Sequence, residues 1–226
     1  MDHIFPPQSR AELMQRSHAL AGLTLAEIAT RHQLPVPTRL HHAKGWIGQL
    51  LERCLGATAG PMAAPDFQQL GIELKTIPVN HLGQPRESTY VCSVPLNGEA
   101  EHSWQTSWVR NKLACVMWLP IESEPQIPVA QRRIGTAILW SPSTQEEHCL
   151  QQDWEEHMEF IQCGRVHEIS AHHGACLQIR PKAANKQALC ATTDENGQQV
   201  KTLPRGFYLR PSFTGAILRR QYCHQR

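Results

Sequence analysis

The sequence predicts an α/β fold, because segments with the apolar spacing of helices occur before, between and after segments with the alternation of strands. Residues 72–77 (Ile-Glu-Leu-Lys-Thr-Ile) alternate apolar and polar side chains, which is the period of a strand with one buried face. Residues 46–55 instead carry apolar side chains three and four positions apart and stop at Gly56, which is typical of a helix. The 226 residues are enough for one large domain or two small lobes joined near residues 164–175.

Two shorter helices are predicted near the N-terminus by their capping residues. Ser9 can cap a helix that runs to about Ala21. Thr24 and Glu27 form a capping-box pattern, in which each side chain accepts a hydrogen bond from the backbone N–H of the other residue. This pattern predicts a second helix that runs to about His32.

The remaining elements follow from apolar runs bounded by glycine, proline or asparagine. We expect strands at residues 88–94, 115–121, 137–140, 176–179 and 206–209, and helices at residues 109–113, 143–163 and 212–222. The strand at 88–94 is predicted to form a hairpin with the strand at 72–79. A further turn is expected at Asn196-Gly197. The apolar residues of the helix at 143–163 share one face, so its many acidic residues are expected to form a solvated face.

The composition indicates an ordinary globular protein, with 41% hydrophobic and 19% charged residues. No apolar run reaches the length of a membrane-spanning helix, so no membrane association is expected. The N-terminal residues lack the basic and apolar regions of a signal peptide, which predicts a cytoplasmic protein. The eight cysteines are scattered without a Cys-x-x-Cys pair, which predicts reduced thiols, and the histidines lack zinc-site spacing.

Basic residues are concentrated in the C-terminal part of the chain. Residues 180–226 hold nine Lys or Arg side chains and two acidic ones, whereas the preceding part is mildly acidic. This asymmetry favours a surface that contacts a polyanion. A solvated surface without a partner explains the same charges, and charge alone does not separate the two interpretations.

Two carboxylates and one lysine occur close together at residues 65–75. Glu73 and Lys75 point to the same side of the predicted strand, and Asp66 precedes them with a possible turn at Gly71. Carboxylate oxygens suit Mg²⁺, and a nearby ammonium group can meet a water or a phosphate. A half-exposed strand with an ordinary polar face explains the same residues and is the more frequent case, because Glu-x-Lys is a common triplet.

Blocks of sequence along nearly the whole chain resemble the MutH family, the strand-discrimination endonucleases of bacterial methyl-directed mismatch repair. The blocks occur in the order of the family, and as a set they are specific, although Glu-x-Lys alone is not. They are Lys44-Gly45-Trp46-Ile47-Gly48, Glu52, Gly56–Gly60, Asp66-Phe67, Gly71–Pro78, Ile179–Asn185 and Leu203–Leu209.

The resemblance implies a restriction-endonuclease-like fold, with a mixed central sheet flanked by helices. A single nuclease domain over residues 1–226 is implied, whose two lobes form a DNA-binding cleft. The N-terminal lobe, at about 1–163, is expected to be catalytic, and the C-terminal lobe, at about 164–226, is expected to read the DNA.

The implied activity is Mg²⁺-dependent nicking of the unmethylated strand on the 5′ side of the G at hemimethylated GATC sites, which leaves a 5′-phosphate. Mn²⁺ or Ca²⁺ is expected to replace Mg²⁺ in binding. The enzyme is expected to act as a monomer on double-stranded DNA, stimulated by MutL and coupled through MutL to MutS. The alternatives are a restriction-type enzyme that cuts both GATC strands and a catalytically inert GATC-binding module.

Carried over residue by residue, the resemblance assigns the metal site and the catalytic groups. Asp66 and Glu73 are the implied metal ligands, with the backbone carbonyl of Leu74 as a further oxygen. Lys75 is expected either to position and deprotonate the attacking water or to stabilise charge on the phosphate. Glu52 is expected to orient Lys75 or the waters on the metal.

The DNA-binding residues are implied in the same way. Arg180 and Pro181 match positions at which the family contacts the GATC bases, and Tyr208 matches the position that senses the adenine methyl group. A phosphate contact without base reading remains the alternative for Arg180 and Lys182, because most protein–DNA hydrogen bonds are of that kind. Further DNA-contacting positions are matched by Lys44, Tyr90 and Lys112.

Several positions depart from the usual pattern of the family, none of them at Asp66, Glu73 or Lys75. Tyr90 stands where phenylalanine is usual, which adds a hydroxyl group to a side chain with an expected wedge role. Arg86 stands where an apolar residue is usual. The others are Ala43, Asn80, Trp108 and Asn111.

Overall fold

The computed structural model describes residues 4–37, 45–60, 64–96, 103–183, 185 and 187–223. The chain forms two compact units that interleave along the sequence, and each is described by itself. The first unit comprises Met1–Glu87, Ala114–Ser141 and Gly215–Arg226, and the second comprises Ser88–Leu113 and Pro142–Thr214. The division into a catalytic and a DNA-reading lobe near residue 163 stays a prediction about function.

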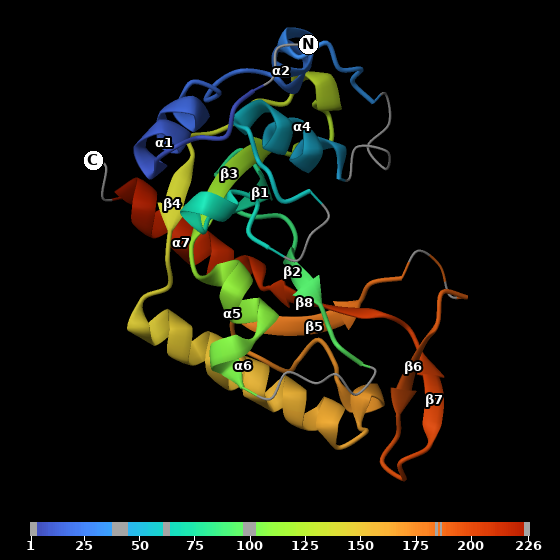
Figure 1. Ribbon diagram of the computed structural model, residues 1–226. Coiled ribbons are helices and arrows are strands. Elements are labelled where there is room, and N and C mark those ends of the chain that lie inside the picture. Colours follow the sequence, from blue (N-terminus) through green and yellow to red (C-terminus); the bar gives the residue numbers. More distant parts are fainter. Residues whose placement is uncertain are drawn as a thin grey trace. The chain divides into compact units, whose positions relative to one another are not determined.

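The first unit is built on a three-stranded sheet with the order β1-β3-β4 (Figure 1). β1 (Glu73–Val79) runs parallel to β3 (Val116–Glu122), and β4 (Ile138–Trp140) runs antiparallel to β3. The predicted mixed sheet is therefore confirmed. β3 is buried along nearly its whole length, as a central strand is, whereas β1 lies at an edge of this sheet.

Helices α1 (Arg10–His18), α2 (Leu25–Arg31) and α4 (Trp46–Leu55) share one hydrophobic core with this sheet. Local signals set their ends. Ser9 Oγ accepts a hydrogen bond from the Glu12 N–H at 3.1 Å, and both hydrogen bonds of the predicted capping box between Thr24 and Glu27 are present. α4 ends at Gly56, whose φ of 81° is left-handed.

The later part of helix α7 (Pro211–Cys223) completes this unit. Ile217 and Leu218 on α7 are fully buried. The Tyr222 hydroxyl donates a hydrogen bond to the Thr136 carbonyl at 3.1 Å, and this bond ties the end of the helix to the segment before β4.

The second unit is built on an antiparallel sheet with the order β2-β8-β5. Its strands are β2 (Thr89–Ser93), β8 (Arg205–Leu209) and β5 (Leu177–Pro181). The predicted hairpin between the strands at 72–79 and 88–94 is therefore wrong. The turn between them does form, with the Asn80 N–H bonded to the Gln84 carbonyl, but β2 pairs with a strand far along the chain. A local turn does not decide which strand becomes the partner of β2. Its partner is β8, which carries the buried Phe207 and Leu209.

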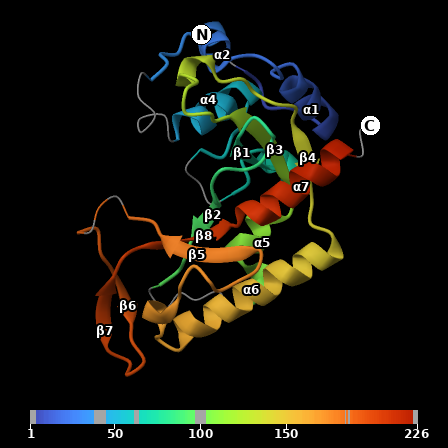
Figure 2. The ribbon, with the colours of Figure 1, turned by 180° about the vertical axis from the view of Figure 1, so that it is seen from behind.

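Helices α5 (Trp108–Leu113) and α6 (Thr144–Gln162) pack on this sheet, α5 against β2 and α6 against β5 (Figure 2). A capping box between Ser143 and Glu146 opens α6. The predicted apolar face of α6 is confirmed, because its members are all buried: Leu150, Trp154, Met158 and Ile161.

Asp153 corrects the prediction that the acidic residues of α6 form a solvated face, since it is only 6% exposed. Its Oδ1 accepts from the Ala175 N–H at 2.8 Å, and its Oδ2 accepts from the N–H groups of Cys176 and Leu177 at 2.6 and 2.7 Å. These donors belong to the end of the loop before β5 and to the first residue of β5. The buried carboxylate is thus compensated by charge-assisted hydrogen bonds.

The prediction of reduced cysteines is wrong for Cys149 and Cys176, which form a disulfide. Cys149 lies one turn before Asp153 on α6, and Cys176 stands directly before β5. The hydrogen bond from the Cys176 N–H to Asp153 therefore also holds the two sulfur atoms close together, a proximity that sequence spacing does not reveal. Free thiols are carried by Cys54, Cys115, Cys163 and Cys190.

Strands β6 (Cys190–Thr193) and β7 (Gln199–Thr202) form a separate antiparallel hairpin. The turn predicted at Asn196-Gly197 is confirmed: Gly197 has a φ of 78°, and Asp194 Oδ1 accepts from the Asn196 N–H at 2.9 Å. The strands themselves are not apparent in the sequence, because Thr192 is the buried residue among them and no apolar alternation marks them.

Short 3₁₀ helices occur at Gln68–Leu70, Trp104–Thr106, Val129–Gln131 and Val166–Glu168. Among the helices in the described ranges, none is both long enough and apolar enough to cross a membrane.

Asp153→Asn is expected to lower the free energy of unfolding by about 1–3 kcal/mol, because the amide presents N–H₂ to backbone groups that need an acceptor. Urea unfolding under constant redox conditions measures the change. Glu159→Gln is the matched control, since Glu159 is exposed on the same helix. Equal stability of D153N and the parent protein would contradict the role given to this carboxylate.

Candidate active site and nucleic-acid interface

Glu73 and Lys75 lie together at the start of β1 and on the same side of the strand, as the alternation predicts. Lys75 Nζ donates to Glu73 Oε1 at 2.8 Å. The side chain of Glu73 is 5% exposed and that of Lys75 is 15% exposed. The interpretation of a half-exposed strand with an ordinary solvated face fails for this pair, because a carboxylate is kept out of water only where other groups compensate its charge.

Asp66 reaches the same place through a tight turn. The 3₁₀ helix Gln68–Leu70 and Gly71, with a left-handed φ of 63°, return the chain so that Phe67 and Ile72 pair through their backbones. Asp66 Oδ2 then accepts a hydrogen bond from the Leu74 N–H at 2.8 Å. The predicted gathering of two carboxylates and one lysine is thus present.

The Leu74 carbonyl is directed toward Asp66. Within a strand the N–H and C=O groups of one residue point to the same side, and successive residues alternate between the two sides. The Glu73 N–H donates to the Cys115 carbonyl, on the side of β3. Leu74 therefore presents both its N–H and its C=O to the opposite side, where Asp66 lies.

This donor set fits a hard divalent cation. Asp66, Glu73 and the Leu74 carbonyl offer oxygen atoms only, which is the ligand type that Mg²⁺ takes. A second group of side chains, Cys149 and Asp153 with Cys176, also brings its ligand atoms within 4.8 Å of one another. That group does not suit a metal ion, because its sulfur atoms are bonded to each other and its carboxylate already accepts three backbone N–H groups.

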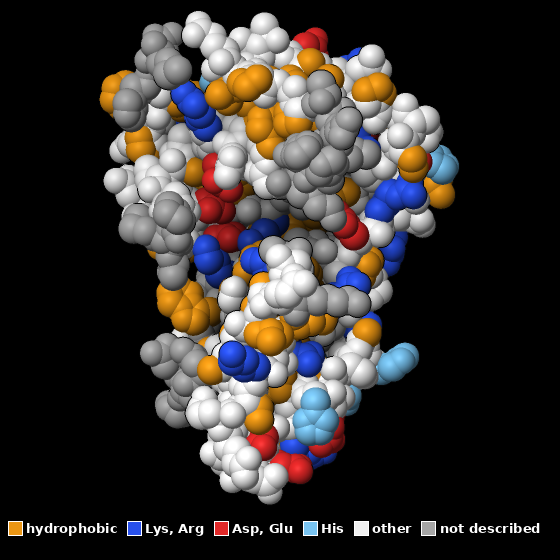
Figure 3. All heavy atoms as spheres, turned by 90° about the vertical axis from the view of Figure 1, so that its right-hand side faces the viewer, with side chains coloured by type: hydrophobic (Ala, Val, Ile, Leu, Met, Phe, Trp, Pro, Cys, Tyr) orange, Lys and Arg blue, Asp and Glu red, His pale blue; other side chains and the backbone are white. Residues whose placement is uncertain are grey.

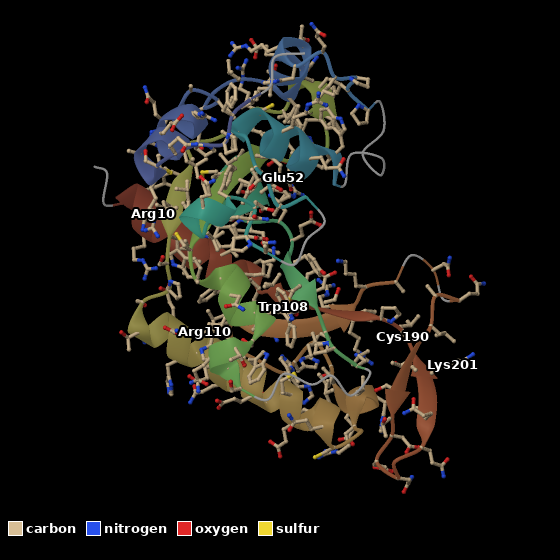
Figure 4. All side chains as sticks on the ribbon, viewed as in Figure 1. Arg10, Glu52, Trp108, Arg110, Cys190 and Lys201 are labelled. Carbon is tan, nitrogen blue, oxygen red and sulfur yellow. A yellow bond between two sulfur atoms is a disulfide. The ribbon has the colours of Figure 1, made fainter. Side chains whose placement is uncertain are left out.

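Glu52 lies on α4, which packs against β1. Glu52 is half-buried, and Figure 4 shows it on the side of the helix that faces β1. Gly48 lies one turn earlier on the same side of α4, where a Cβ atom would be 3.6 Å from Glu52 Oε1, an ordinary van der Waals contact. The structure thus brings the helix of Glu52 to the strand of Glu73 and Lys75, and the orientation of Lys75 by Glu52 stays a prediction.

The second unit gathers three of the predicted DNA-binding residues, Tyr90, Tyr208 and Arg180, on one face of its sheet. Tyr90 on β2 and Tyr208 on β8 stand opposite each other, with their ring centroids 5.4 Å apart in an edge-on arrangement. Both rings lie over Gly206, where a Cβ atom would come within 2.9 Å of Tyr90 and 3.1 Å of Tyr208. Burial raises the pKa of Tyr208, and Tyr90 adds to the shift. We call this face the reading face.

Arg180 shares the reading face with these rings. It is exposed on β5, in register with Gly206, and its Nη1 donates to Ser88 Oγ at 3.2 Å. The buried Gln178, opposite Tyr208, donates from Nε2 to the same Ser88 oxygen at 2.7 Å. Pro181 is exposed at the end of β5, and as the residue next to Arg180 it points to the opposite face of the strand.

Some members of the reading face were not predicted as site residues. Lys182 Nζ lies 3.2 Å from the centroid of the Tyr90 ring, in a cation–π contact, and the Tyr90 hydroxyl is 3.0 Å from Ser93 Oγ. The hydroxyl by which Tyr90 departs from the family pattern thus has a local partner. Lys182 is visible in the sequence as part of the basic segment, whereas Ser93 and Gly206 carry no signal without the pairing of β2 with β8.

Lys112 and Lys44 are the remaining predicted DNA contacts. Lys112 is half-buried on α5, the helix on which Trp108 is 41% exposed and Arg110 Nε donates to Glu147 at 2.8 Å (Figure 4). Lys44 falls outside the described residues. Figure 3 shows Lys and Arg side chains spread over one face of the protein, with acidic side chains gathered beside some of them, so the surface charge is mixed.

Arg86, another departure from the family pattern, has a clear structural role in the first unit. Its Nη1 donates to Glu124 Oε2 at 3.0 Å. Glu124 also accepts from the His81 N–H at 2.8 Å, and this bond is the main cause that lowers the pKa of the carboxyl group. The arginine thus stabilises the turn after β1 through Glu124. None of its hydrogen bonds or ion pairs among the described residues involves Asp66, Glu73 or Lys75.

Comparisons with known proteins agree with this geometry. The family model described as "DNA mismatch repair enzyme MutH" matches residues 55–153, which include Asp66, Glu73 and Lys75. The DNA mismatch repair protein MutH of Vibrio parahaemolyticus is 53% identical over 96% of both chains. That of Serratia proteamaculans is 52% identical over 96% of this chain and 95% of its own. That of Shewanella baltica is 52% identical over 98% of this chain and 100% of its own.

Identity at this level over nearly the full length leaves no room for a different family with the same fold. The mixed α/β architecture fits the restriction-endonuclease-like fold of these proteins. The chain belongs to the MutH family of DNA mismatch repair enzymes.

Proposed function

We propose that this protein is a Mg²⁺-dependent endonuclease that nicks the unmethylated strand on the 5′ side of the G at hemimethylated GATC sites and leaves a 5′-phosphate. The observation that carries the proposal is the cluster at the start of β1, where Asp66 bonds to the Leu74 N–H and Lys75 bonds to Glu73. The membership in a family of mismatch repair enzymes supports the choice of DNA as substrate.

Asp66, Glu73 and the Leu74 carbonyl would hold the metal ion in this proposal. The chemistry that Mg²⁺ supplies when bound is polarisation of a phosphoryl oxygen and activation of a water molecule. Lys75, held by Glu73, places a positive charge beside the carboxylates, where it orients the attacking water and stabilises negative charge on the phosphate. Glu52 orients Lys75 from α4.

The reading face selects the site of cleavage. Arg180 and Pro181 contact the edges of the GATC bases, and Tyr208 senses the methyl group on adenine N6 in the major groove. Lys44, Tyr90 and Lys112 add further DNA contacts. We propose that the enzyme works as a monomer in the cytoplasm, is activated by MutL and receives the mismatch signal from MutS through MutL.

A restriction-type enzyme that cuts both GATC strands and an inert GATC-binding module are the competing functions. A strand-resolved cleavage assay on a hemimethylated GATC duplex with Mg²⁺, with and without MutL, separates them. We expect one nick, in the unmethylated strand, and faster nicking with MutL. Cleavage of both strands or of neither would reject the proposal.

Asp66→Asn should lower the rate of nicking at least about 100-fold, because it removes the charge of a metal ligand and the loss of even an outer-shell group costs about 10- to 100-fold. The amide oxygen can still accept from the Leu74 N–H, so the fold and binding of GATC DNA should be retained. Single-turnover cleavage and fluorescence anisotropy measure the two properties. Asp194→Asn, in the β6–β7 turn, is the control, and a D66N protein that nicks at the rate of the parent would refute the metal site.

Tyr208→Ala should bring the ratio of the nicking rates on hemimethylated and fully methylated GATC duplexes closer to one. The reason is that contact of one methyl group with an apolar surface contributes about 10- to 200-fold to discrimination. The same assay with the two duplexes measures the ratio. Tyr222→Phe, which alters a tyrosine of the first unit, should leave the ratio unchanged. If Y208A discriminates as the parent does, Tyr208 is not the methyl sensor.

Gly206→Ala should have a similar effect without removing an aromatic ring. The added methyl group cannot remain 2.9 Å from Tyr90 and 3.1 Å from Tyr208, so one or both rings must move. We expect about tenfold weaker discrimination between the same two duplexes, within the range given for one methyl group. Near-UV circular dichroism detects movement of the rings. Unchanged spectra together with unchanged discrimination would show that the methyl group is sensed without the close packing of the two rings over Gly206.

A further inference from the structure

We propose that Ser88 is a positioning residue that holds the guanidinium of Arg180 in the orientation for reading a base. This inference rests on the proposed function, because it assigns to Ser88 a part in the recognition of GATC by the reading face. Ser88 takes no part in the proposed cleavage chemistry. Its expected contribution is to the preference of the protein for GATC over other sequences.

Ser88 joins a buried side chain to an exposed one. Gln178 is 5% exposed and donates from Nε2 to Ser88 Oγ at 2.7 Å, and Arg180 is exposed and donates from Nη1 to the same oxygen at 3.2 Å. A serine hydroxyl has two acceptor lone pairs, and these two bonds use both. The packing of Gln178 in the sheet therefore fixes the Ser88 oxygen, and the Ser88 oxygen fixes one end of Arg180.

The two donors lie on the same face of β5, because Gln178 and Arg180 are two residues apart in one strand. Ser88 immediately precedes β2, which lies on the other side of β8. The hydrogen bonds therefore span the reading face from one outer strand to the other, past Tyr208. The charge of Arg180 acts on Tyr208, since it opposes the rise in the pKa of that hydroxyl.

The contact sets which donors of Arg180 remain for DNA. Arginine reads guanine through two parallel hydrogen bonds, to O6 and N7. With Nη1 engaged by Ser88, the Nε and Nη2 groups remain as an adjacent pair of donors with that geometry. An exposed arginine otherwise samples many rotamers, so a fixed guanidinium loses less freedom when it binds a base.

The test compares four proteins: the parent, Ser88→Ala, Arg180→Ala and the double variant. Fluorescence anisotropy gives the affinity of each for a GATC duplex and for a scrambled duplex of equal length, with Ca²⁺ in place of Mg²⁺ to prevent cleavage. We expect S88A to lower the preference for GATC about 3- to 10-fold, the scale of the net contribution of one intramolecular hydrogen bond. In the Arg180→Ala background the same change should have almost no effect on this preference.

Two further variants separate positioning from a structural role. Ser88→Thr keeps the hydroxyl and should retain the preference. Ser170→Ala, at a half-buried serine of the same unit whose hydroxyl contacts His173 and the His172 N–H in its own loop, should not alter it. Urea unfolding of S88A measures any loss of stability. A purely structural role for Ser88 predicts equal loss of affinity for both duplexes and equal effects in the two backgrounds.

The outcomes also separate this inference from the proposed function. If the parent protein prefers GATC, two results overturn the inference alone. One is an S88A variant with unchanged preference for GATC, and the other is a double variant in which the effects of S88A and R180A on this preference add. A parent protein without preference for GATC overturns the proposed function and the inference with it.

Discussion

The hydrogen bond from the Leu74 N–H to Asp66 Oδ2 is the constraint on which the candidate active site depends. Asp66 is far enough from Glu73 in sequence that only the turn at Gly71 brings it back to β1. The bond also uses a backbone group that the edge of the sheet leaves without a strand partner, and it places the carboxylate on the side to which the Leu74 carbonyl points. The oxygen atoms of Asp66, Glu73 and the Leu74 carbonyl are thereby brought to one part of the first unit, although Asp66 is distant from the other two in sequence.

The reading face is organised by a different constraint, the absence of a side chain at Gly206. The rings of Tyr90 and Tyr208 approach each other only because nothing projects from β8 between them. Two cationic groups lie near these rings. Lys182 makes a cation–π contact with the Tyr90 ring, and Arg180 donates a hydrogen bond to the Ser88 hydroxyl. The first unit thus offers negative oxygen atoms that suit a metal ion, and the second offers hydrogen-bond donors and aromatic surface that suit the edges of bases.

Local signals predicted much of this structure, and long-range pairing accounts for the errors. The capping residues Ser9, Thr24 and Ser143 mark the starts of helices correctly, because a cap depends on residues within one turn. The alternation along β1 correctly places Glu73 and Lys75 on one side, but it cannot tell that this side is shielded from water. The partner of β2, the burial of Asp153 and the disulfide of Cys149 all depend on segments distant in sequence. For the same reason Ser88 and Gln178 carry no signal until β5, β8 and β2 are assembled.

The interleaving of the two units has a consequence for the synthesis of the protein. The first unit includes the later part of α7, with the buried Ile217 and Leu218, whereas α1, α2 and β1 of that unit are made long before. While the ribosome translates the second unit, the nascent first unit still lacks this part of α7. Folding of this chain therefore cannot proceed strictly from the N-terminus, and the unfinished unit depends on rapid completion or on chaperones to avoid aggregation.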